Sequence, residues 1–157
     1  IKKTLKKTDL FLFSAPKNWM YGKEGAKEAS NIKMTVRDPG IVSASYGAET
    51  LLESGKIKLI EVDRYMKFRD TLKVFAQDGV EPVEIAGQSR IQVKVKLTKE
   101  QLKLFEGLKG CKISSSWKIL TGSKLAYANL EVNVPNLNDV LKLCRQNSIE
   151  VSYVHDF

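Results

Sequence analysis

The chain has 157 residues and a formal net charge of +8, with 43% hydrophobic and 28% charged residues. This composition is typical of one globular domain, or of two small ones that share a core, and the short apolar runs exclude a membrane-spanning helix and a signal peptide. The excess of Lys and Arg favours polyanionic partners, which we take to be nucleic acid or an acidic protein surface rather than a membrane.

Residues 1–8 are predicted to form a basic arm. Initiator methionine is normally removed only before a small residue, so Ile1 indicates either an omitted preceding residue or a processed terminus. Four lysines of the arm are candidate contacts to a polyanion: Lys2, Lys3, Lys6 and Lys7.

Residues 9–85 are predicted to form a smaller, mixed α+β subdomain. It begins with a buried strand over 9–15 and a loop or short helix over 16–31. Apolar and polar residues then alternate over 32–37, the period of a half-buried strand.

The next predicted element is a helix. Asp38, Pro39 and Gly40 are typical of a helix start, and we expect this helix to run through Glu53. A buried strand over 57–62 follows it.

A second helix of this subdomain is predicted from Asp63, its cap, to Gly79. Its apolar stripe is typical of a core face rather than of a cofactor site and consists of Tyr65, Phe68, Leu72 and Phe75. A short strand over 80–85 and a subdomain boundary at 86–89 complete the first half.

Residues 90–157 are predicted to form a second subdomain of order β-α-β-β-α-β. Its elements are a strand over 90–97, a helix from Thr98, strands over 112–120 and 125–134, a helix capped by Asn136 or Asn138 and ending at Gln146, and a strand over 149–157. Trp117 is expected to face inward, with Ile113 and Ile119. This order, with two helices of about three turns, is the split-βαβ or ferredoxin-like arrangement, in which one sheet face stays open.

The sequence carries no pattern for catalysis or metal binding. Nucleophilic triads need a base, and the single histidine, His155, stands beside Asp156 on what we expect to be the opposite strand face. One histidine and two separated cysteines cannot supply a structural zinc site, and no acidic pair lies in a calcium-loop pattern. No glycine lies in a phosphate-binding loop motif. We therefore expect a protein that is not an enzyme and has no metal or cofactor.

The two cysteines are Cys111 and Cys144. Two isolated cysteines do not make a disulfide framework. They are predicted to be reduced, partly buried side chains, which favours a cytoplasmic location.

The open sheet face is the candidate binding surface. Cations bind phosphates, an aromatic ring can stack on a base, and amides can read base edges, so the mixture predicts a platform for single-stranded nucleic acid. The candidate residues on the sheet are Arg90, Gln92, Lys94, Lys96, Lys112, Lys118, Tyr127 and Asn129.

In the order of its elements this half resembles the RNA-recognition motif. The third strand of that family carries a signature of basic, Gly, aromatic, small, aromatic, aliphatic, any and aromatic residues, which aligns with 125–132. Tyr127, Ala128 and Leu130 match their places, whereas the departures are Leu125, Ala126, Asn129 and Val132. The resemblance is one of topology and covers less than half of the chain, so it does not assign a function.

Two functions are thus left open. The first is non-catalytic binding of single-stranded RNA or DNA through the basic face and the arm. The alternative is a protein-interaction or assembly role, such as a viral inhibitor of a host protein or a virion component, which a homo- or hetero-oligomer would suit.

Overall fold

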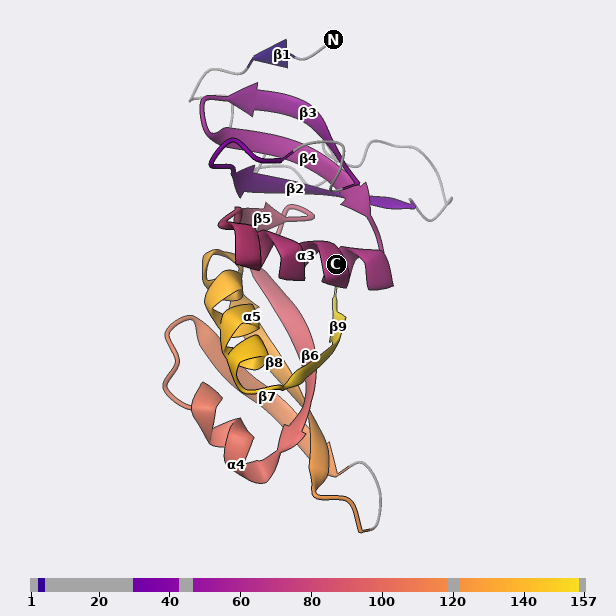
Figure 1. The fold of residues 1–157 in the computed structure, drawn as a ribbon, viewed down its shortest axis with the longest axis vertical. Coiled ribbons are helices and arrows are strands. Elements are labelled where there is room, and N and C mark those ends of the chain that lie inside the picture. The colour runs from indigo at the N-terminus through magenta and orange to yellow at the C-terminus, as the bar shows by residue number, and fades with distance from the viewer. Residues whose placement is uncertain (1–2, 5–29, 43–46, 119–121, 156–157) are drawn as a thin grey trace.

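The computed structural model describes residues 3–4, 30–42, 47–118 and 122–155. Over these residues the protein is an α+β structure with two sheets and a helix, α3 (Met66–Asp78), between them (Figure 1). The first sheet has the strand order β1-β3-β4-β2-β5, and the second has the order β7-β8-β6-β9. All described strand pairs are antiparallel except β1 with β3, which is parallel.

The strands of the first sheet are β1 (Lys3–Thr4), β2 (Asn31–Arg37), β3 (Ala48–Ser54), β4 (Ile57–Asp63) and β5 (Glu81–Ile85). Those of the second are β6 (Arg90–Thr98), β7 (Cys111–Lys118), β8 (Leu125–Asn133) and β9 (Glu150–Val154). Two further helices are α4 (Lys99–Leu102), followed by a 3-10 turn over Lys103–Phe105, and α5 (Leu137–Gln146). Within these segments, no helix combines the length and the apolar character needed to cross a bilayer.

Some predicted features fall outside the described residues, so the structure does not test them. Among them are the strand over 9–15, most of the loop over 16–31, and the inward position of Ile119.

The predicted helix over 38–53 is wrong, because its second half is strand β3. This strand pairs with β4 along its length, from Ala48 opposite Val62 to Ser54 opposite Ile57. Acid, proline and glycine also begin tight turns, and here the hairpin partner decides which structure forms.

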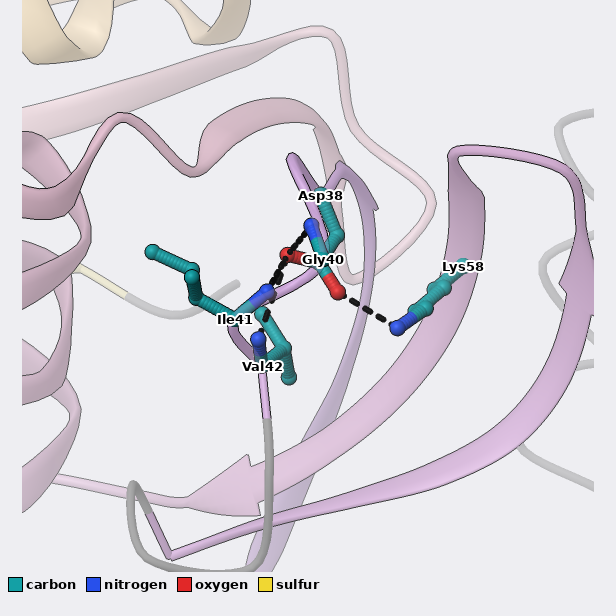
Figure 2. Close-up of polar contacts among 5 residues, drawn as sticks. All are labelled: Asp38, Gly40, Ile41, Val42 and Lys58. Atoms are coloured by element: carbon teal, nitrogen blue, oxygen red, sulfur yellow. Dashed lines mark hydrogen bonds and ion pairs between the residues drawn. The ribbon is translucent and has the colours of Figure 1, made fainter.

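A turn follows β2, and the side chain of Asp38 holds it together (Figure 2). Its Oδ1 accepts hydrogen bonds from the backbone N–H groups of Gly40, Ile41 and Val42 at 2.9, 2.8 and 3.1 Å, and its Oδ2 accepts one from Lys58 on β4. The residue is buried. Asp38 thus satisfies three N–H groups that the irregular backbone leaves without strand partners.

Helix α3 follows β4 as predicted, but its start differs. The N-cap residue is Tyr65, with a φ of 64° and no side-chain cap, so Asp63 does not cap the helix. Instead, Asp63 forms an exposed ion pair with Lys67 at 3.1 Å. Gly79 ends the helix in the left-handed conformation, as predicted. Three of the four stripe residues are fully buried, whereas Tyr65 is exposed; the buried ones are Phe68, Leu72 and Phe75.

Strand β6 has the predicted alternation, and the predicted capping at Thr98 is confirmed. The Thr98 Oγ1 accepts from the N–H of Gln101 at 3.2 Å, while the Gln101 Oε1 accepts from the N–H of Thr98 at 2.9 Å. The α-helix that follows has only four residues, not the predicted three turns. Gly107 and Gly110, with φ of 73° and 72°, return the chain to the sheet soon after Phe105 is buried.

Helix α5 runs to Gln146 as predicted, and its N-cap is Asn136, although no side-chain hydrogen bond caps it. Asn138 is not the cap. It is buried, and its Nδ2 donates to the carbonyl oxygen of Val80 at 2.8 Å, which joins α5 to the segment between α3 and β5.

The buried side chains form one continuous cluster that includes residues of both sheets. Helix α3 contributes to it from between the sheets and packs on both α5 and β9. Arg69 of α3 also donates to the carbonyl oxygens of Val151 and Ser152 in β9, at 3.5 and 3.3 Å. The division into subdomains 9–85 and 90–157 stays a prediction. Buried side chains from both ranges belong to the same core cluster.

Candidate nucleic-acid interface

One face of the second sheet carries no helix in the described residues, and bulges shape it. In β7, Ile113 lies opposite Leu130 and Ser115 lies opposite Asn129, so Ser114 is the extra residue. A β-bulge shifts the alternation of side chains by one residue. The β7 residues after Ser114 therefore lie on the face opposite to the one that unbroken alternation predicts.

The bulge moves Trp117 to the open face, which overturns its predicted inward position. Trp117 lies opposite Tyr127 of β8, and their ring centroids are 5.8 Å apart with an interplanar angle of 39°. The Trp117 side chain is exposed (40%). An exposed tryptophan beside a tyrosine is a surface on which a planar group can stack.

A second bulge has the same effect at the other edge of the sheet. Lys94 of β6 lies opposite Tyr153, and the next residue, Val95, lies opposite Val151, so Ser152 is the extra residue in β9. Val151 and Val154 are both buried. Tyr153, which lies between them in the sequence, is on the open face. The ring of Tyr153 meets His155 edge to face, with centroids 4.9 Å apart.

Lys94 lies at the centre of this face and connects the aromatic residues. Its Nζ is 4.4 Å from the Tyr127 ring centroid and 5.3 Å from that of Trp117. These are cation–π distances, so the two rings hold the ammonium group in place. The side of the ammonium group that faces away from the rings stays available to an anion. In the described residues Lys94 forms no ion pair.

A shallow hollow of about 490 Å³ lies in the middle of these groups. Its lining residues come from all four strands and the residue after β9, and they are Lys94, Trp117, Tyr127, Asn129, Ser152, Tyr153 and His155. The Asn129 side chain is oriented at this hollow by its Nδ2, which donates to the Oγ of Ser115 at 3.3 Å. The backbone carbonyl oxygen of Asn129 accepts from the Oγ of Ser114 at 2.9 Å.

Four other predicted residues lie on the same face with different surroundings. Arg90 forms an exposed ion pair with Glu131 of β8, Nη1 to Oε1 at 3.0 Å, so an incoming phosphate would compete with that carboxylate. Gln92 is exposed. Lys96 is half-buried, opposite Tyr127 and Glu150, and Lys112 is exposed, opposite Glu131.

The remaining predicted cations are not tested as contacts. Lys118 ends β7 opposite Ala126, so the shift at Ser114 places its register position on the covered face of the sheet and not on the open face where it was predicted. Lys3 lies in β1 opposite Leu52, and only the backbones of Lys3 and Lys118 are described. Lys2, Lys6 and Lys7 fall outside the described residues.

Elsewhere in the described residues, the reactive groups are few. Both cysteines are free, as predicted. Burial raises the pKa of Cys111 to about 11; burial, followed by the neighbouring Cys111, raises that of Cys144 to about 12. Thiols held protonated in this way are poor nucleophiles and poor metal ligands. The described segments also bring no three His, Cys, Asp or Glu side chains together as a metal-binding group would need.

Comparisons with family models, with curated proteins and with solved structures find no match to this chain.

Proposed function

We propose that this chain is a non-catalytic protein that binds single-stranded RNA or DNA through the open face of its second sheet. We also propose that residues 90–157 have the split-βαβ, ferredoxin-like arrangement, which their element order and the strand order β7-β8-β6-β9 support. Two unlinked thiols suit a reducing compartment such as the cytoplasm.

The observation that carries the proposal is the cluster of Trp117, Tyr127 and Lys94. Two adjacent aromatic rings with a cation held over both offer stacking and charge in one place. Each stacked base contributes about 1–3 kcal/mol in proteins that bind single strands, and stacking accepts any base. Two aromatic positions of the face, Trp117 and Tyr153, were not among the residues predicted from the sequence.

The arrangement favours single strands over duplexes. Rings that lie on a sheet face can stack only on bases that are unpaired and turned outward, as they are in single strands and loops. Lys96 and Lys112 lie on the same face on opposite sides of the cluster, on β6 and β7, where they can meet the phosphates of a strand that crosses the sheet.

A titration of labelled single-stranded oligonucleotides, followed by fluorescence anisotropy at several salt concentrations, tests the proposal. For the double variant Lys96→Gln/Lys112→Gln, we expect the slope of log K against log salt to become shallower by roughly 0.7 per lost phosphate contact. For Trp117→Ala or Tyr127→Ala, we expect a loss of about 1–3 kcal/mol with the slope unchanged, since stacking releases no ions.

The matched control is Lys99→Gln, which removes an exposed lysine from α4, away from the hollow. It should leave the slope and the aromatic contribution unchanged. An absence of binding to any single-stranded oligonucleotide at about 50 mM salt would contradict the proposal, because charge-driven binding is strongest at low salt.

A protein partner is the alternative use of the same face. An exposed tryptophan in a hollow is also typical of a binding hot spot. The alternative predicts association that depends on Trp117 but depends little on salt, and a protein that elutes early from heparin.

A further inference from the structure

A second hollow, of about 600 Å³, lies in the groove between helices α3 and α5. Figure 1 shows these helices on the same side of the molecule, and they pack directly on each other. The hollow shares no lining residue with the one on the open sheet face. Its volume is within the range typical of small-molecule sites.

The floor of this groove is apolar. It consists of buried side chains from both helices, from the residue before β9 and from β9 itself, namely Ala76, Leu141, Cys144, Ile149 and Val151. The high pKa of Cys144 fits this setting, because burial is its largest cause and keeps the thiol neutral. The floor therefore suits a hydrocarbon chain or ring.

The rim is basic. Lys73 of α3 and both Lys142 and Arg145 of α5 line the groove, and no Asp or Glu of the described residues does. None of these three cations forms an ion pair within the described parts of the chain. With the Gln77 side-chain amide turned so that its oxygen faces Arg145, this oxygen accepts from Arg145 Nη2 at 2.9 Å. The contact holds the guanidinium at the rim without neutralising its charge.

We infer that the α3–α5 groove binds a small anionic amphiphile: one apolar chain or ring that carries a carboxylate or a phosphate. The apolar part lies on the floor, and the anionic head is placed among Lys73, Lys142 and Arg145. The lining residues span only 73–77 of α3 and 141–146 of α5, less than two turns of each helix, which is too short a groove for a docked amphipathic helix.

The test is calorimetric titration of the full chain with decanoate, decyl phosphate and decyltrimethylammonium, each below its micelle concentration. Acetate and inorganic phosphate serve as probes that have the charge but no chain. We expect saturable binding of one molecule for the two anionic decyl compounds, with amide signals of α3 and α5 shifting, and none for the other three. Binding of only one anion would identify the head group.

Two charge variants locate the site. Arg145→Gln and Lys142→Gln should each weaken binding of the anionic decyl compounds about two- to fivefold, the range for partly exposed charge pairs, while Lys99→Gln should not. Equal binding of the cationic compound, affinity unchanged in both variants, or no binding at all would overturn the inference. None of these outcomes bears on the nucleic-acid proposal, which concerns other residues.

Discussion

At the scale of single residues, Asp38 shows how one carboxylate can hold an irregular segment. Burial raises the pKa of this group, but the hydrogen bond from Lys58 and those from the N–H groups of Ile41, Gly40 and Val42 together outweigh it. The result is a pKa lowered from 3.8 to about 2. The charged form is therefore the one that the folded protein stabilises (Figure 2).

We predict that Asp38→Ala lowers the free energy of unfolding by about 2–4 kcal/mol, because it removes the hydrogen-bond acceptor of Lys58 and of three backbone N–H groups. Asp38→Asn should cost less, since its oxygen can still accept from the backbone. Chemical denaturation of both variants at neutral pH measures the two costs. Equal stability of Asp38→Ala and the unmodified protein would show that the turn is held by other contacts.

The same residue predicts an acid dependence. Because the pKa is lower in the folded state, its stabilisation is complete above the unfolded pKa of 3.8 and is lost as the pH falls towards 2. The shift corresponds to about 2 kcal/mol. Denaturation curves between pH 5 and 2 should show this loss in the unmodified protein, and Asp38→Asn should lack that part of it.

Glu84 is the opposite case. Burial raises its pKa, and among the residues that the structure describes its Oε1 finds no hydrogen-bond partner. A raised pKa means that the folded state loses stability as the pH rises through the titration of this group. We predict that Glu84→Gln is more stable than the unmodified protein at neutral pH and that this gain vanishes in acid. A constant difference from pH 4 to 8 would contradict this account.

At the scale of elements, the sequence predicted the strands with alternating patterns well. β2, β6 and β8 lie where their alternation placed them, because one strand face is buried and the period of two is visible. β4, predicted as a buried strand over 57–62, spans Ile57–Asp63. The predicted helix over 38–53 failed because strand pairing with β4 overrode local helix signals. The length of α4, which has only one turn, was overestimated because the apolar spacing continues past Phe105 although the helix does not.

The candidate site was only partly predictable, and the bulges explain why. Lys94, Tyr127 and Asn129 were found from alternation alone, since β6 and β8 pair without interruption. Trp117 was placed inward because unbroken alternation from Ile113 puts it there. The extra residues are serines, Ser114 and Ser152, and no local pattern separates a bulged serine from a paired one.

Deleting Ser114 tests the register that places Trp117. Ser115, Ser116 and Trp117 already pair in order with Asn129, Ala128 and Tyr127, so a strand without the extra residue keeps Trp117 opposite Tyr127 on the open face. We predict that the deletion variant retains oligonucleotide binding. Ser114→Ala keeps the residue count, so it should change stability by less than about 1 kcal/mol and also retain binding. Loss of binding in the deletion variant alone would contradict the prediction.

At the scale of the whole molecule, α3 connects the two sheets. Its buried face belongs to the same cluster as the β6 and β8 side chains, so neither sheet has a complete core of its own. We predict that Phe75→Ala costs about 3–5 kcal/mol and that both sheets still unfold together. Circular dichroism and tryptophan fluorescence should give coincident transitions. Separate transitions would instead support two independent subdomains at 9–85 and 90–157.

The central claim is that nucleic acid stacks on the open face, and the fluorescence of Trp117 reports it directly. The chain has two tryptophans, so the measurement uses Trp19→Phe, which leaves Trp117 as the single emitter. Titration with a single-stranded oligothymidylate of about ten nucleotides should quench Trp117 to a plateau at the same concentrations at which anisotropy reports binding. Lys96→Gln should shift the midpoint but keep the plateau. Binding by anisotropy with unchanged Trp117 emission would contradict the claim, because the nucleic acid would then lie elsewhere on the protein.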